Sequence, residues 1–354
     1  MWRRYGVSEE HKMNLQQLYA QLKHEMDKLD FDRLWPGFQP LKFALYDDST
    51  CFFNGKYIPK TDEFIANTAI KYQGEDIAIW YAMEEMPLPV FVSKIVHEMF
   101  HAFQNSEKWS SFPKEMEALS RYTYYSENLS LRLHENQLLL QLTAQFDVRL
   151  YQDLLACRKY RSVRFPYEYL YEVCVEDIEG SANFIEWMTL RQLSAQMADR
   201  WVHNMKTAML NPASFFPVRI SCYYSGALFI HAALSAGESA YAPVERPLGT
   251  SLVKNVRLKQ ISEDNPLIAE ALKRYDEETE HIIESAVSLN DVVLCGPAKM
   301  IGVNLYDARY KDGYITSRYF VIYQEGDQQK TIYGNYIVRM ADETTIECIY
   351  RWPQ

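Results

Sequence analysis

The chain has 354 residues, of which 48% are hydrophobic and 24% charged, and its formal net charge is −10. Such a chain can bury a large core in one large domain or two modest ones. The acidic balance, with lysines and arginines scattered along the chain, argues against nucleic acid or an anionic membrane as a partner, because both bind basic surfaces. No apolar run reaches the roughly 18 residues that a membrane helix requires. Residues 1–6 lead into charged residues and not into the apolar core of a signal peptide, so we expect none here.

The N-terminal part of the chain predicts one helix followed by a small sheet. Residues 9–30 have the apolar spacing of an amphipathic helix, which ends in the proline-containing loop 35–40. Strand-like segments follow at 41–46, 51–58 and 76–81, and turn signals such as Asn-Gly and Gln-Gly punctuate them. We expect a small mixed sheet that leads into the next helix.

The segment 96–104 reads V-H-E-M-F-H-A-F-Q and contains an H-E-x-x-H motif. On a helix, His97 and His101 stand one turn apart on the same face, so both imidazoles can reach a single Zn²⁺ at about 2.0–2.1 Å. Glu98 points about 100° around the helix, where it can face water at the metal without binding the metal. The uncharged flanks favour a helix buried beneath a cleft. The motif therefore predicts half of a catalytic zinc site.

A catalytic zinc usually has three protein ligands and one open position, so a third ligand must come from elsewhere in the chain. The metzincin arrangement is one option, and it places Glu107 at the ligand position. The glycine of that arrangement is missing, because the chain has Gln104 at its position. Glu107 is therefore one candidate for the third ligand, and only its spacing from the histidines supports it.

A second candidate region is the strongly helical segment 171–183, which puts Glu172, Glu176 and Glu179 on one face. Carboxylates that share a helix face among apolar residues need a cation. Glu179 and Glu176 are both candidates for the third ligand because they share this face.

From Glu179 onward the chain reads E-G-S-A, and with the H-E-x-x-H motif it resembles the gluzincins, zinc peptidases that include the thermolysin group. In that family the third ligand is a Glu on a later helix, often within E-G-x-A. The resemblance implies one Zn²⁺ per chain, bound by His97, His101 and Glu179. Glu98 would then be the general base. Asn183 stands where the thermolysin group has an Asp, and it would orient a ligand imidazole.

Gluzincin chemistry also needs a donor for the oxyanion that forms when water attacks a carbonyl, and Tyr or His commonly serves. The segment 219–226 resembles the Y-x-x-G segment that opens a helix in several gluzincins. Tyr223 is our candidate for the donor, with Tyr224 and His231 as alternatives. The chain has 26 Tyr, most of which we expect to pack as amphipathic core residues.

The resemblance further implies a place for the substrate. Strand 76–81 would lie at the edge of the cleft, where an extended peptide could add as a further strand, and the alternative is an ordinary interior strand. The pattern from 89 to 290 is mostly helical and includes long helical stretches at 129–159 and 263–288. This helical lobe would supply the second wall of a cleft.

The sequence pattern changes after residue 290. Turn signals separate segments rich in Val, Ile, Tyr and Thr, such as 314–323 and 345–352, and predict a small antiparallel β unit. The sequence leaves open whether this unit is an accessory binding module or packs on the catalytic lobe.

The six cysteines are dispersed along the chain without a C-x-x-C pair. This spacing is typical of reduced thiols buried in a core and favours a cytoplasmic location. The positions are Cys51, Cys157, Cys174, Cys222, Cys295 and Cys348.

Taken together, the patterns predict an α+β protein in three regions. Residues 1–88 form the N-terminal helix and sheet, 89–290 the mainly helical zinc-binding region, and 291–354 the β unit. The predicted function is a cytoplasmic zinc metallopeptidase that acts on a peptide or small protein, with Glu98 as general base and Tyr223 as oxyanion donor. The alternatives are a zinc hydrolase of a non-peptide amide and a non-catalytic binding protein that retains the fold. Oligomeric state and the choice between endopeptidase and exopeptidase stay open.

Overall fold

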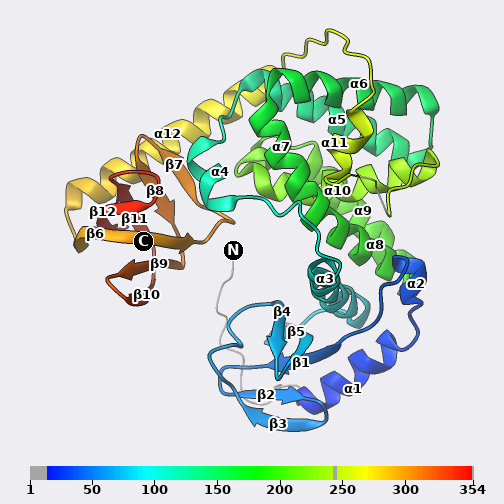
Figure 1. Ribbon diagram of the computed structural model, residues 1–354, viewed down its shortest axis with the longest axis horizontal. Helices are drawn as coiled ribbons and strands as arrows, with labels where there is room; N and C mark the ends of the chain where they lie inside the picture. The colour runs from blue at the N-terminus through cyan, green and yellow to red at the C-terminus, as the bar shows by residue number, and fades with distance from the viewer. Residues whose placement is uncertain (1–13, 84, 242–244, 353–354) are drawn as a thin grey trace. The chain divides into compact units, whose positions relative to one another are not determined.

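The computed structural model describes residues 14–83, 85–241 and 245–352. The chain has an α+β architecture with a mixed sheet, an antiparallel sheet and many helices, as the sequence predicts (Figure 1). It divides into two compact units, which we name unit 1 (within Met1–Ser110, and Ser181–Asn204) and unit 2 (Ser111–Gly180, and within Met205–Gln354). Each unit thus combines two separate segments of the chain. The division at 1–88, 89–290 and 291–354 stays a prediction.

The sheet of unit 1 has the strand order β3-β2-β1-β5-β4. β1 and β5 pair in parallel and the other neighbours are antiparallel, so the sheet is mixed. Two hairpins have two-residue turns with positive φ, at Asn54 and Gly55 and at Gln73 and Gly74. This backbone conformation suits the twist of a tight hairpin. The strands are β1 (Lys42–Tyr46), β2 (Thr50–Phe53), β3 (Lys56–Pro59), β4 (Thr68–Tyr72) and β5 (Glu75–Tyr81).

The predicted edge position of strand 76–81 is wrong. β5 lies between β1 and β4, and β4 is the edge strand on that side. β4, whose five residues are joined to β5 by the Gln73-Gly74 turn, was not predicted from the sequence. The alternative, an interior strand, is the one that the structure confirms.

Helices α1 and α3 pack on this sheet. In α1, buried Leu15, Leu18, Leu22 and Met26 recur at helical spacing, and the side chain of Asn14 caps the first turn. Residues 9–13 of the predicted first helix lie outside the described residues. Helix α3 packs against both α8 and β5. The helices are α1 (Leu15–Met26), α2 (Phe31–Leu34), α3 (Leu88–Ser106), α8 (Ser181–Leu193) and α9 (Ala195–Met209), whose last turn belongs to unit 2.

Unit 2 contains a group of packed helices. The helical stretch predicted at 129–159 consists of two helices, because α5 ends at Ala144 and α6 begins at Val148. Asp147 starts the new helix by accepting hydrogen bonds from the main-chain N–H of Arg149 and Leu150. The elements are α4 (Glu115–Arg121), α5 (Ser126–Ala144), α6 (Val148–Arg164), α7 (Pro166–Val175), η2 (Glu176–Gly180), η3 (Pro212–Phe215), α10 (Val218–Ser235), α11 (Leu248–Val253) and α12 (Pro266–Leu289).

A buried network of ion pairs joins α5, α6, α7 and η2. Arg132 and Arg161 both bind Glu172, and Arg158 binds Glu176 through two N–H groups at 2.7 and 2.9 Å. The predicted need of these two carboxylates for a cation is thus met by guanidinium groups. The members are Arg132, Glu135, Arg158, Arg161, Glu172 and Glu176, all of them buried. Their formal charges cancel, as a buried network requires.

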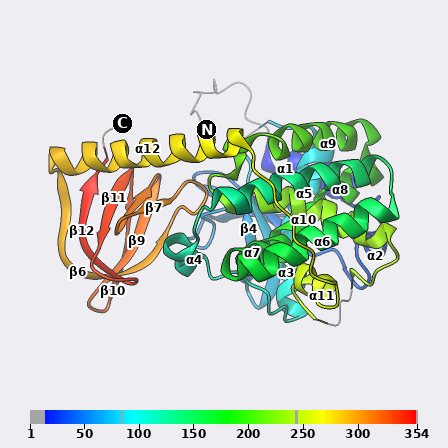
Figure 2. The ribbon, with the colours of Figure 1, turned by 90° about the horizontal axis from the view of Figure 1, so that it is seen from above.

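The chain ends in an antiparallel sheet with the order β10-β9-β6-β12-β11-β8-β7. α12 runs along this sheet (Figure 2), and its Ile283 and Ala286 pack against Ile337 and Tyr350. The strands are β6 (Val292–Val303), β7 (Arg309–Lys311), β8 (Tyr314–Ser317), β9 (Phe320–Glu325), β10 (Gln328–Tyr333), β11 (Tyr336–Met340) and β12 (Thr345–Arg351). Within the described ranges, no helix combines the length and apolar character needed to cross a membrane.

The prediction of six reduced cysteines is wrong for one pair. Cys295 and Cys348 form a disulfide between β6 and β12, where the strand register sets them opposite each other. They are 53 residues apart in sequence, so spacing alone could not show that they meet. Cys51, Cys157 and Cys222 are buried thiols, as predicted.

Candidate metal centre

Helix α3 brings His97 and His101 together on one face. Pro87 and Pro89 stand at its start, and its buried apolar residues hold it against β5 and α8. The Nε2 atoms of the two imidazoles lie 3.2 Å apart. Two ligand nitrogens at 2.0–2.1 Å from a tetrahedral Zn²⁺ would be separated by about 3.3 Å. The pair therefore has the spacing that one zinc ion requires.

His97 is oriented by a buried carboxylate that the sequence analysis missed. Its Nδ1 lies 3.5 Å from Glu186, which also binds Lys94 at 3.0 Å and accepts a hydrogen bond of 3.1 Å from Trp201. Burial alone would raise the pKa of Glu186, but Lys94 and His97 lower it to about 2. An ionised acceptor at Nδ1 holds the proton there and directs Nε2 to a metal. The prediction gave this role to Asn183, which is also buried, about one turn earlier on α8.

His101 is oriented by Gln104. The Nδ1 of His101 lies 2.8 Å from the Gln104 amide oxygen, and the Gln104 amide nitrogen donates to the Ser181 hydroxyl at 2.8 Å. Gln104 is fully buried, so these contacts are shielded from water. Gln104, which replaces the glycine of the metzincin pattern, thus orients His101. Both histidines present Nε2 on the same side.

Glu179 lies in η2, a π-helical turn that continues without a break into α8. Among the residues that the structure describes, it forms a group with His97 and His101 in which one candidate ligand atom of each residue lies within 4.8 Å of the others. α8 packs on α3, the helix that carries both histidines. π-Turns inside helices are frequent at functional sites. Two imidazoles and one carboxylate are a ligand set typical of catalytic zinc, with a position left for water.

The other two candidates for the third ligand have different surroundings. Glu176 binds Arg158 through both carboxylate oxygens and accepts a hydrogen bond of 2.5 Å from Ser225. Glu107 is an exposed residue at the C-terminal end of α3. Neither belongs to the group of candidate ligands found among the residues described.

Glu98 and Tyr223 are the predicted catalytic residues. Glu98 is partly exposed on α3, next to His97 in sequence. The hydroxyl oxygen of Tyr223 accepts a hydrogen bond from Arg219, which leaves the phenolic O–H as a donor. The same Arg219 binds Glu179 at 2.9 Å, so Tyr223 is one side chain away from the candidate ligand.

The two alternative oxyanion donors lie further along α10. Tyr224 lines a pocket of about 280 Å³ together with Phe216 and Tyr306. His231 is half-buried, two turns beyond Tyr223. Tyr223 is linked to Glu179 through Arg219, which binds both side chains.

Two glycines let η2 and α10 approach each other closely. A Cβ on Gly180 would lie 2.5 Å from the Cα of Gly226, and a Cβ on Gly226 would lie 2.6 Å from the carbonyl oxygen of Glu176. Both obstacles are backbone atoms, which cannot swing aside. Because these two glycines of E-G-x-A and Y-x-x-G have no side chain, the turn that contains Glu179 can pack directly against the helix that contains Tyr223.

We expect Gly180→Ala to destabilise the protein by about 1–3 kcal/mol, because the backbone of η2 or α10 must move to admit the methyl group. Unfolding in urea measures this change. Gly302→Ala is the matched control, since its Cβ would meet only one atom within 4 Å, at 3.9 Å. A Gly180→Ala protein as stable as the control variant would contradict the close contact.

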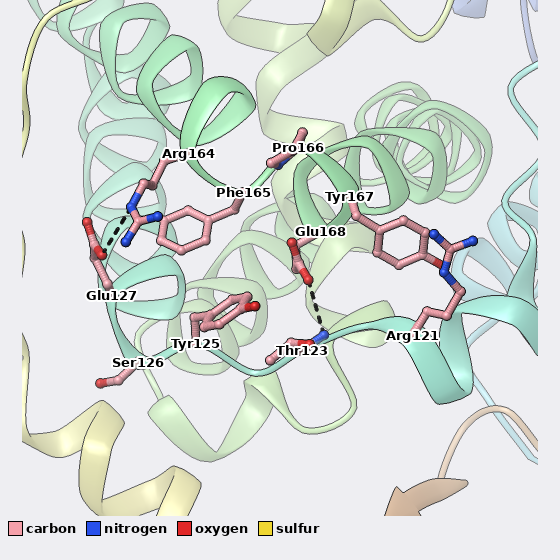
Figure 3. Close-up of a pocket in the computed structure, with 10 residues that line it drawn as sticks. All are labelled: Arg121, Thr123, Tyr125, Ser126, Glu127, Arg164, Phe165, Pro166, Tyr167 and Glu168. Atoms are coloured by element: carbon pink, nitrogen blue, oxygen red, sulfur yellow. Dashed lines mark hydrogen bonds and ion pairs between the residues drawn. The ribbon is translucent and has the colours of Figure 1, made fainter.

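A separate pocket of about 520 Å³ lies in unit 2 (Figure 3). Its charged groups are engaged with their neighbours, as shown by the ion pair of Arg164 with Glu127 at 3.9 Å and the Glu168 carboxylate that accepts from Thr123 at 3.3 Å. Its lining consists of Arg121, Thr123, Tyr125, Ser126, Glu127, Arg164, Phe165, Pro166, Tyr167 and Glu168. These residues include no histidine or cysteine, so the pocket does not offer a metal site of this kind.

Comparisons with protein-family models, with curated proteins and with solved structures found no match for this chain. The function is therefore inferred from the side chains of the site itself.

Proposed function

We propose that this protein is a zinc-dependent metallopeptidase of the gluzincin type. The main support for the proposal is the group of His97, His101 and Glu179. The Nδ1 atom of each imidazole contacts a neighbouring side chain, and the two Nε2 atoms face each other. One Zn²⁺ per chain would be held by these three side chains. When bound, zinc lowers the pKa of a water molecule to about 7 and polarises a carbonyl oxygen.

The protein's own residues supply the proton transfers and the binding of charge. Glu98 stands beside His97, and its carboxylate accepts the proton of the attacking water and then delivers it to the nitrogen of the leaving amine. The O–H of Tyr223 donates to the oxygen that becomes negative as the carbonyl is attacked. Glu186 and Gln104 hold the two imidazoles in place throughout. The bond that breaks is the peptide bond.

Metal removal and restoration test the proposal. The purified protein is dialysed against a chelator and assayed with a mixed library of quenched fluorescent peptides and a panel of small non-peptide amides. We expect hydrolysis of peptides to disappear with the metal and to return with about one equivalent of Zn²⁺. Hydrolysis of the small amides alone would redirect the assignment to a zinc amidase. Zinc binding without hydrolysis of either set would contradict a catalytic function.

A further inference from the structure

The guanidinium of Arg219, on the first turn of α10, donates hydrogen bonds to three different side chains. Its Nε donates to Glu115 at 2.8 Å, its Nη2 donates to Glu179 at 2.9 Å, and its Nη1 donates to the hydroxyl of Tyr223. The side chain is 13% exposed, so these contacts are largely shielded from water. All four residues belong to unit 2. The arginine is thus the common partner of the candidate third ligand and the candidate oxyanion donor.

The chemistry of the guanidinium suits this task. It is planar, always charged and presents its N–H groups in a fixed fork, so it sets the angle between its partners as well as their distance. A carboxylate that receives an N–H on one oxygen presents the other oxygen to a metal, which favours ligation through a single oxygen. Glu115 binds Arg219 and keeps the fork from turning.

We propose that Arg219 is a positioning residue that holds Glu179 and Tyr223 as one unit, with Glu115 as its anchor. The inference rests on the proposed function. It adds that metal affinity and oxyanion stabilisation are coupled through one side chain, so a change at Arg219 damages both together. Arg219 itself touches neither the metal nor the substrate in this scheme.

The test compares Arg219→Met, Arg219→Lys, Tyr223→Phe and the double variant Arg219→Met/Tyr223→Phe with the wild type. Zinc affinity is measured by competition with a fluorescent chelator, and kcat and KM are measured at saturating zinc. Arg246→Met is the matched control, because Arg246 is also 13% exposed and binds Asp177 of the same turn at 2.9 Å, outside the ligand group.

We expect Arg219→Met to weaken zinc binding about 10–100-fold, as loss of a group that orients a ligand does, while Tyr223→Phe and Arg246→Met stay within about twofold of the wild type. At saturating zinc, kcat should fall in Arg219→Met with KM little changed. The double variant should be no slower than the slower single variant, because the two residues act on one step. Arg219→Lys keeps the charge but not the fork, so it should recover more zinc affinity than kcat.

Zinc binding of Arg219→Met within twofold of the wild type, or fully additive losses of kcat in the double variant, would overturn the inference. A wild type that binds no zinc would instead contradict the proposed function. If Arg219→Met fails to fold, Glu115→Gln serves in its place, since it removes the anchor and keeps the arginine. It should then weaken zinc binding in the same direction, and unchanged binding would overturn the inference.

Discussion

Glu98→Gln is expected to keep about one zinc per chain and to lose peptide hydrolysis by about 10²–10⁴-fold. The substitution preserves the size and hydrogen-bonding shape of the side chain but removes the carboxylate that accepts the proton. His97, His101 and Glu179 are untouched, so the metal site should be intact. The loss should appear in kcat and kcat/KM alike, because proton transfer belongs to the transition state.

The control for this variant is Glu107→Gln, a change of the same kind on an exposed residue at the end of the same helix. It should leave both zinc content and hydrolysis near the wild-type values. A Glu98→Gln protein that binds zinc and hydrolyses peptides at the wild-type rate would exclude Glu98 as the general base.

Glu172→Gln is expected to destabilise the folded protein by about 3–5 kcal/mol, the usual cost of breaking a buried ion pair from one side. Glu172 is 1% exposed and binds Arg132, Arg161 and the hydroxyl of Tyr122. The substitution leaves two buried guanidinium groups with one carboxylate fewer, so the network acquires a net positive charge. Urea unfolding at neutral pH measures the change. Glu270→Gln, on a salt bridge whose partners are 65% and 66% exposed, is the control and should stay within about 0.5 kcal/mol.

The pH dependence of unfolding gives a second measure of the same carboxylate. Burial alone would raise the pKa of Glu172, but Arg132 and Arg161 lower it from 4.5 to about 2. A lowered pKa contributes stability above about pH 4.5, and that contribution is lost as the pH falls towards 2. The wild type should therefore lose its advantage over Glu172→Gln across this interval. A constant difference between the two proteins from pH 7 to pH 2 would contradict the ionised state of Glu172.

The part of the site that lies on one helix could be predicted from the sequence. A four-residue spacing on a helix is enough to put His97 and His101 on one face, and the structure brings their Nε2 atoms to 3.2 Å. Helical spacing also put Glu172, Glu176 and Glu179 on one face, but it could not say which cation each would meet. That choice depends on arginines 11 to 40 residues away in sequence.

The rest of the site depends on tertiary packing. Glu186 reaches His97 because α8 packs on α3, and 92 residues separate it from Lys94, another of its partners. The register of β6 and β12 likewise brings Cys295 to Cys348. The period of a sequence pattern shows which residues share a face of one helix or strand. It does not show which helices or strands pack together, so contacts between elements could not be predicted from it. Edge strand β4 was missed because five residues with mixed exposure show no clear alternation.

The central claim is that His97, His101 and Glu179 bind one zinc ion. Metal content by inductively coupled plasma mass spectrometry, after mild dialysis of the wild type, Glu179→Gln and Glu107→Gln, tests it most directly. We expect about one zinc per chain in the wild type and in Glu107→Gln, and little in Glu179→Gln. A wild type without zinc after reconstitution, or a Glu179→Gln protein that holds zinc as tightly as the wild type, would contradict it.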